Sequence, residues 1–225
     1  MSKESHDDND SGDDHVDDVV NNGISSSLPS KSVITKILNE LVLVQAGEHN
    51  ILTFQEMQIM KEIRSRYCCE LLTRRNMEVI LIPYVESTNE VIADLAATSG
   101  EEIDINRHIA DGSLVIESDA HLLIDSYAHG GSGFHNYIQD LQTHAKQKGK
   151  EGLGIVLDIS SLLLMDDIEK LLKFESEVCP KNHPELEHSS LLCCYNGFLF
   201  DKIERAYRET IFNNHHRKLC ALTTS

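Results

Sequence analysis

Short apolar runs alternate with longer amphipathic segments along most of this chain, and this alternation constrains the fold more than any other feature. The runs are rich in β-branched residues and are bounded by polar ones, as in MEVILIPYV (77–85) and GLGIVLDIS (152–160). A strand that is buried on both faces has this composition. The strands predicted in this way cover residues 49–54, 77–85, 114–119, 152–160, 189–196 and 218–224.

The segments between these runs carry apolar residues three and four positions apart, which is the spacing of one helical face. The helices predicted in this way cover residues 55–76, 88–100, 134–149, 165–178 and 199–214. Strands alternate with helices and no hairpin turn signal intervenes, which favours βαβ crossovers. We therefore predict an α/β fold of three layers, in which a mostly parallel sheet carries helices on both faces.

The first 30 residues differ in composition from the rest of the chain. They contain eight acidic residues against one lysine and few large apolar side chains. Such a segment cannot bury enough apolar surface to offset its chain entropy, so a disordered acidic tail is predicted over 1–30. Residues 31–225 are long enough to form one core. This domain is predicted to begin with an additional helix at about 32–46, whose exposed face is a candidate contact with a partner or a second copy of the chain.

The charge and hydropathy of the chain exclude several classes of function. A formal net charge of −17 offers no basic surface for nucleic-acid phosphates. No apolar stretch approaches the length of about 18–20 residues that a membrane span needs. The N-terminus is acidic rather than of the secretory type. These features predict a cytoplasmic protein that contacts neither nucleic acid nor membrane.

Two adjacent cysteines, Cys193 and Cys194, end an apolar run in the segment SSLLCCYNGFLF (189–200). Adjacent cysteines scarcely form a disulfide without strain, and in a strand they point to opposite faces. The six cysteines include no C-x-x-C pair, and no H-E-x-x-H motif occurs. His215 and His216 are adjacent, so they diverge. The prediction is therefore two buried strand residues and no metal site; a nucleophilic cysteine with a histidine base stays open as a third function.

No phosphate-binding loop of the form G-x-x-x-x-G-K-[ST] occurs in the chain. The segment HGGSGFH (129–135) has glycines but no lysine and follows a later strand. Asp158 ends an apolar strand, where an ATPase of the phosphate-loop class has its magnesium-binding acid. Without the loop, a capping or hydrogen-bonding role suits Asp158 better than metal binding. We predict neither an enzyme nor a bound cofactor.

Five segments carry a resemblance to a known family: EHNILTF (48–54), GSLVIESD (112–119), YIQDLQTHAKQKGKEGLGIVLDIS (137–160), LLKFESEV (171–178) and LLCCYNGFLF (191–200). In their order and spacing, over roughly residues 48–220, the chain resembles the MEDS domain, a sensory domain of methanogens and methylotrophs. The family's late signature is Cys, any residue, Tyr, Asp, three residues, then Phe. Cys193, Tyr195 and Phe200 match this signature, whereas Asn196 replaces the acid.

The resemblance implies further properties of the chain. His49 matches the family's histidine at the start of the first strand, Glu175 matches its late glutamate, and His215 lies near its late histidine. The family's acid and aromatic before that glutamate are displaced or lost here, in LDISSL (157–162). Members resemble the RecA-type core of circadian-clock ATPases, the KaiC-like fold, without its phosphate loop. The resemblance thus implies an archaeal or bacterial stand-alone sensory domain that binds a small organic ligand and signals through a protein partner.

In open parallel sheets, ligands bind beyond the carboxyl ends of the strands. We therefore predict a ligand site there, with the Cys193 thiol packed beneath it. The polar groups predicted for this site are those of His49, Asp158, Glu175, Tyr195 and Asn196. The alternative function is a ligand-free, degenerate ATPase-like module for protein interaction.

Overall fold

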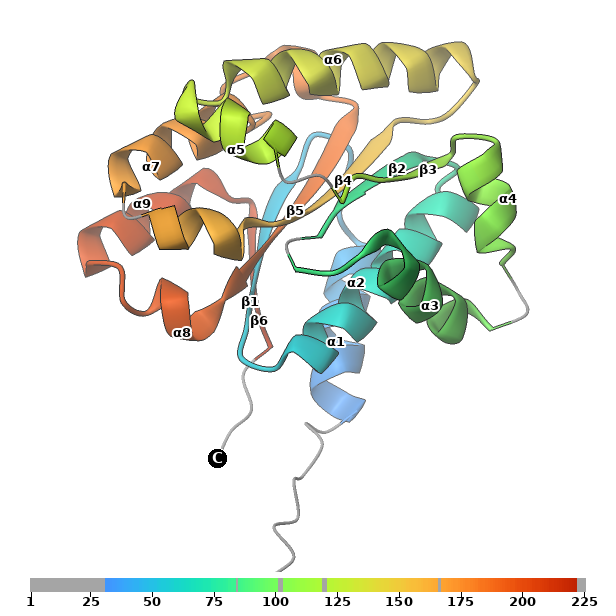
Figure 1. Cartoon of the computed structure of the whole chain (residues 1–225), viewed down its shortest axis with the longest axis horizontal. Helices are drawn as coiled ribbons and strands as arrows, with labels where there is room; N and C mark the ends of the chain where they lie inside the picture. The colour runs from blue at the N-terminus through green and yellow to red at the C-terminus, as the bar shows by residue number, and fades with distance from the viewer. Residues whose placement is uncertain (1–30, 84, 101–102, 119–120, 166, 222–225) are drawn as a thin grey trace, which may run out of the picture.

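The computed structural model describes residues 31–83, 85–100, 103–118, 121–165 and 167–221. The tail predicted over 1–30 lies outside the described residues. Six strands form one sheet in the order β3-β2-β4-β5-β1-β6, and each neighbouring pair is parallel (Figure 1). The strands are β1 (His49–Phe54), β2 (Glu78–Ile82), β3 (Leu114–Ile116), β4 (Leu153–Asp158), β5 (Ser189–Asn196) and β6 (Arg217–Ala221).

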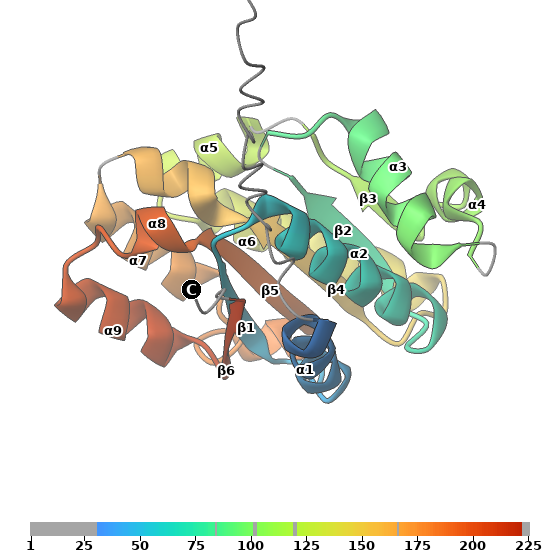
Figure 2. The same cartoon turned by 90° about the horizontal axis from the view of Figure 1, so that it is seen from below.

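Helices cover both faces of this sheet (Figure 2). One face carries α1 (Lys31–Val42), α2 (Met57–Thr73), α3 (Thr88–Ser99) and α4 (Ile105–Ala110). The other carries α5 (His121–Ala128), α6 (Ser132–Gln147), α7 (Ile168–Glu177) and α9 (Arg205–Asn214). The predicted three-layer α/β architecture is confirmed. In the described part of the chain, no helix combines the length and the apolar character that crossing a membrane requires.

Strand β5 lies inside the sheet between β4 and β1, and its side chains divide between two apolar cores. Leu192 and Cys194 face the helices α1 to α4. Leu191, Cys193 and Tyr195 face the helices α5 to α9. This is the alternation that a strand imposes on successive residues. The two adjacent cysteines therefore lie in different cores, and both are buried.

Several predicted boundaries differ from the structure. The helix predicted over 199–214 is two helices, α8 (Gly197–Phe200) and α9, because the chain turns after Phe200 without a Gly or Pro to signal it. The helix predicted at about 32–46 ends at Val42. The short elements α4, α5 and the 3-10 helices η1 (Ile159–Met165) and η2 (Pro184–Leu186) were not predicted, because one or two turns leave too few periodic residues to detect.

Helix α1 packs its apolar side inward, against α2 and β6. Ile34, Ile37 and Leu41 are buried there. The outer side carries polar residues such as Lys36 and Asn39. This helix therefore covers part of the core, and contact of its outer face with a partner stays a prediction.

We expect Leu41→Ala to lower the free energy of unfolding by about 2–5 kcal/mol, because the side chain is fully buried and its loss leaves a cavity. Asn39→Ala, on the exposed side of the same helix, should change it by no more than about 0.5 kcal/mol. Urea unfolding followed by circular dichroism measures both. Equal effects of the two substitutions would show that α1 does not belong to the folded core.

Candidate functional site

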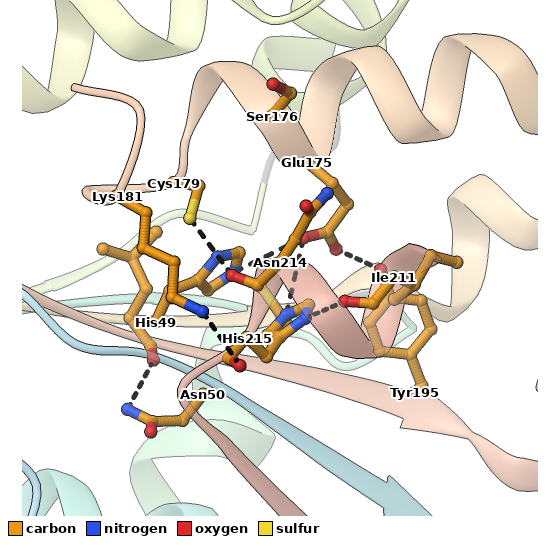
Figure 3. Close-up of polar contacts among 12 residues, drawn as sticks. His49, Asn50, Glu175, Ser176, Cys179, Lys181, Tyr195, Ile211, Asn214 and His215 are labelled. Carbon is orange, nitrogen blue, oxygen red and sulfur yellow. Dashed lines mark hydrogen bonds and ion pairs between the residues drawn. The ribbon is translucent and has the colours of Figure 1, made fainter. Parts of the chain in front are cut away.

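Four side chains from distant parts of the sequence meet between β1, β5, α7 and the end of α9. Figure 3 labels three of them, His49, Glu175 and His215. His49 opens β1, Cys193 lies within β5, Glu175 lies in the last turn of α7, and His215 directly follows α9. All four are buried, with exposed fractions of 3% or less. One ligand atom of each residue lies within 4.8 Å of those of the other three. We call these four residues the buried cluster.

The ring nitrogens of both histidines face the same carboxylate oxygen. Oε2 of Glu175 lies 3.4 Å from Nε2 of His49 and 3.4 Å from Nε2 of His215. The thiol sulfur of Cys193 lies 3.1 Å from Nε2 of His49. The centroids of the two imidazole rings are 3.9 Å apart. The four polar groups therefore point at one shared volume.

Neighbouring groups hold the cluster in this arrangement. The Tyr195 hydroxyl donates a hydrogen bond to Oε1 of Glu175, the oxygen turned away from the histidines. Nδ1 of His215 lies 2.7 Å from the carbonyl oxygen of Ile211, which can only accept. Nδ1 therefore carries the proton, and Nε2 of the neutral ring has a free lone pair. Phe200, the last residue of the family signature, packs edge-on against Tyr195 with ring centroids 5.2 Å apart.

Burial dominates the electrostatics of the cluster. It raises the pKa of Glu175 to about 7, against which the Tyr195 hydrogen bond acts only in part. It lowers the pKa of His215 to about 4 and that of His49 well below its ordinary value. It raises the pKa of the Cys193 thiol well above its ordinary value. Burial of the cluster therefore favours uncharged histidines and a thiol, which is the reverse of what an activated cysteine nucleophile needs.

The structure places the residues of the predicted ligand site in two separate regions. His49, Glu175, Tyr195 and Cys193 come together, but His49 lies at the amino end of β1 and not beyond the carboxyl ends of the strands. Asp158 and Asn196 lie at the carboxyl edge and serve local structure. A carboxylate oxygen of Asp158 accepts from the Ser160 amide at 3.0 Å, and the Asn196 side chain accepts from the Leu199 amide at 3.2 Å, which caps α8. The structure thus brings His49, Glu175 and Tyr195 together and leaves the other two apart, because strand ends alone do not fix where side chains point; ligand binding by any of the five stays a prediction.

Sequence reasoning did not place His215 in the site. The residue follows the last helix, next to another histidine, and only the family resemblance distinguished the two. In the structure His215 is buried and His216 is exposed. Lys181, in the loop after α7, fixes the turn at His215. Its Nζ donates to the carbonyl oxygens of Asn213 and His215, each at 3.2 Å. Long-range packing of this kind leaves no local sequence signal.

A cleft of about 380 Å³ opens at the carboxyl edge, between η1, α7, α8 and the start of α9. Its polar lining residues are Asp167, Lys202, Glu204 and Tyr207. Two exposed apolar side chains, Met165 and Phe198, belong to the same elements. The lining is mostly aliphatic and consists of Leu162, Leu163, Leu164, Ile168, Leu171, Leu199 and Ile203.

The connection from β1 to α2 consists of Gln55 and Glu56 alone, so no loop is present there that could surround a phosphate group. Beside this edge, a charged network involves Arg64, which is 1% exposed. Its guanidinium donates to both oxygens of Glu86, and Nζ of Lys61 lies 2.9 Å from Glu86. Asp94 lies 3.3 Å from Lys61 and completes the network. These cations are therefore already paired with carboxylates.

Solved structures of low sequence identity share this fold. A KaiC-like protein, PH0186, from the hyperthermophilic archaeon Pyrococcus horikoshii OT3 matches with a TM-score of 0.50 at 15% identity, over 74% of this chain and 70% of its own. The flagellar accessory protein FlaH from Methanocaldococcus jannaschii matches with a TM-score of 0.54 at 15% identity, over 81% and 75%. The uncharacterized protein PH0321 from Pyrococcus horikoshii, solved with an unknown peptide, matches with a TM-score of 0.58 at 11% identity, over 83% and 82%.

No family model matches the sequence, and comparison with curated proteins gives no significant match. The structural matches therefore establish the fold alone. They confirm the predicted RecA-type, KaiC-like architecture of the chain.

We expect Glu86→Gln to lower the free energy of unfolding by about 3–5 kcal/mol at pH 7, because buried Arg64 then keeps only its longer contact with a carboxylate, the one at 3.8 Å to Asp94. Burial acts to raise the pKa of Glu86, but Arg64 and Lys61 outweigh it and hold the pKa below 4.5. This stabilisation is therefore fully present above pH 4.5 and is lost as the pH falls through the lowered value. Urea unfolding between pH 7 and pH 3 should show the wild type approaching the variant.

The matched control for this experiment is Glu62→Gln on the same side of the molecule. Glu62 pairs at 2.9 Å with Arg66, which is half exposed, so its loss should cost less than about 1 kcal/mol. A loss for Glu86→Gln as small as that of the control would contradict the role of the buried pair.

The exposure of the six cysteines predicts which thiol reacts in the folded protein. Of the six cysteines only Cys220 is exposed, so iodoacetamide at neutral pH should label Cys220 alone and reach the other five only after unfolding. Peptide mass spectrometry measures this, and Cys220→Ser should abolish the rapid labelling. Rapid labelling of Cys193 or Cys194 in the folded protein would instead support the cysteine-dependent enzyme.

Proposed function

We propose that this chain is a regulatory domain that binds a small apolar organic molecule at the carboxyl edge of its sheet and transmits the bound state to a protein partner. This is the function that the resemblance to the MEDS domain implies. The observation that carries the proposal is the aliphatic cleft between η1, α7, α8 and α9.

The cleft has the size and the chemistry that such a ligand needs. Its volume of about 380 Å³ lies within the range of about 300–1,000 Å³ that is usual for small-molecule sites. An apolar cavity of about 150 Å³ is already large enough for benzene. Lys202 and Tyr207 add polar groups that can orient a ligand. Its place beyond the carboxyl ends of β4 and β5 is the usual one for ligands in open parallel sheets.

The elements that line the cleft also carry exposed apolar side chains that a partner could contact. Leu171 lines the cleft, and α7 carries it. The exposed apolar side chains Leu164, Met165 and Phe198 belong to η1 and α8, the other walls. A ligand that changes the packing of these short elements changes the apolar surface that a partner would contact. Differential binding of this kind is what a sensory domain requires.

The connection between β1 and α2 supports a function other than nucleotide hydrolysis. Two residues, Gln55 and Glu56, replace the loop that would hold phosphate groups. The neighbouring cations Lys61 and Arg64 are paired with Glu86. Both features favour a ligand other than a nucleotide.

Binding is tested by native mass spectrometry of the purified chain and by thermal unfolding with benzene, dichloromethane or magnesium ATP added. An apolar ligand at a hundredfold excess over its Kd contributes about 2.7 kcal/mol. For a domain of this size this is a rise in Tm of about 5–10 °C. Benzene or dichloromethane should raise Tm, and magnesium ATP should not.

Ile203→Trp fills the cleft and should abolish the stabilisation by the apolar probes. The matched control is Val85→Trp, which adds the same ring at a side chain that is 64% exposed and outside the cleft. If no probe stabilises the protein, and native mass spectrometry finds a bare chain in a defined oligomer, the ligand-free interaction module replaces the proposal.

A further inference from the structure

We propose that His49, Glu175, Cys193 and His215 together bind one zinc ion, because their four ligand atoms converge on a single buried point. This site lies near the amino end of β1, on the α7 and α9 side of the sheet. It is separate from the cleft at the carboxyl edge and does not depend on the function proposed there.

The distances from Glu175 to the two histidines match those of a tetrahedral coordination sphere, and all four ligand atoms lie within 4.8 Å of one another. Zinc bonds of about 2.0–2.1 Å to nitrogen or oxygen, at tetrahedral angles, place two such atoms about 3.3 Å apart. The distances from Glu175 Oε2 to the two histidine nitrogens are both 3.4 Å. A zinc–sulfur bond of about 2.3 Å gives a nitrogen–sulfur distance of about 3.6 Å. The observed 3.1 Å requires a shift of a few tenths of an ångström at Cys193.

A network of hydrogen bonds explains the cluster less well. Oε2 of Glu175 and Nε2 of His215 are both buried and have no hydrogen-bond partner among the described residues. Their separation of 3.4 Å is longer than the 2.7–3.2 Å of an ordinary hydrogen bond. Leaving such groups unpaired costs about 1–3 kcal/mol each. A metal ion bound between them would remove this cost.

Two of the four ligands, His215 and Glu175, have the outer hydrogen bonds that position metal ligands. A ligating histidine donates its other ring nitrogen to a carbonyl or carboxylate, as His215 does to Ile211. A ligating carboxylate is itself hydrogen-bonded, as Glu175 is by the Tyr195 hydroxyl. The tautomer of His215 and the orientation of Glu175 are thus already those that a metal requires.

Charge and ligand type identify the ion. One thiolate and one carboxylate balance a divalent cation, so the buried site as a whole becomes neutral. One sulfur, two imidazole nitrogens and one oxygen suit zinc, whereas calcium and magnesium need six or more oxygen ligands. Four protein ligands without an open position are typical of a structural zinc site. Such an ion would tie α7 and the end of α9 to the β1–β5 pair.

The other group of this kind in the described part of the chain is weaker. His135, His183 and Glu185 offer three ligand atoms, and Glu185 is exposed. Nδ1 of His183 already lies 3.2 Å from Glu185, as in an ordinary surface pair.

The test is the metal content of the full chain, purified without an affinity tag and without chelators and measured by plasma mass spectrometry. About one zinc per chain is expected. Cys193→Ser should reduce the bound zinc at least tenfold. The matched control is Cys194→Ser, the next residue of β5, which is equally buried but faces the opposite core and should retain the ion.

Three further measurements keep the test decisive if Cys193→Ser does not fold. Cobalt loaded into the wild type and into Cys194→Ser should give the thiolate-to-cobalt absorption band of a tetrahedral sulfur-containing site. Tyr195→Phe leaves all four ligands in place and should weaken zinc binding about 10–100-fold. Removal of zinc from the wild type by a chelator should lower Tm, and added zinc should restore it.

The proposal is overturned if the wild-type chain binds less than about a tenth of an equivalent of zinc even after zinc is added. It is also overturned if Cys193→Ser folds and retains the ion as Cys194→Ser does.

Discussion

Water reaches neither face of the strands β4, β5 and β1, and this burial decides what each polar side chain on them can do. His49, Cys193 and Tyr195 all project into the core beneath α7 and α9, where a charge or an unpaired polar group is costly. Such groups persist in a core only where they satisfy one another or hold an ion. The chain places Glu175 of α7 and His215, which follows α9, opposite them. The layer that covers the sheet therefore supplies the other two residues of the cluster, Glu175 and His215.

Helix α7 connects this cluster with the cleft. Leu171 lines the cleft, and Glu175, one turn later, faces the two histidines. Residues four apart lie on the same face of a helix, so the two sites share one rigid element. A rotation or shift of α7 that accommodates a ligand would displace the Glu175 carboxylate as well. Helix α7 thus contributes one side chain to the closed polar cluster and another to the open apolar cleft.

The architecture was predictable from sequence because both of its signals are local. Apolar runs such as 152–160 and periodic helices between them identify a parallel sheet covered on both faces, and period-two alternation already separates Cys193 from Cys194. The cluster was predictable only in part, because its members are distant in sequence. His49, Glu175 and Tyr195 were recognised through the family resemblance, whereas the position of His215 depends on how Lys181 fixes the turn after α9. Asp158 and Asn196 lie at the carboxyl edge as predicted, but each turns back to its own backbone, to the amides of Ser160 and Leu199, which a strand end in the sequence does not show.

The KaiC-like fold alone does not determine where the polar groups of this chain can act. In this chain the connection after β1 is two residues long, and the cations beside it, Lys61 and Arg64, are neutralised by Glu86. The carboxyl edge on the α2 side is thus closed by its own ion pairs. Among the buried polar atoms without a hydrogen-bond partner, Oε2 of Glu175 and Nε2 of His215 lie on the opposite face of the sheet, where they face each other. A shared fold fixes where strands and helices lie, but the chemistry depends on where ligand atoms converge. Here they converge beneath α7 and α9, and a metal ion bound by the four residues would hold α7, which forms one wall of the cleft, against the β1–β5 pair.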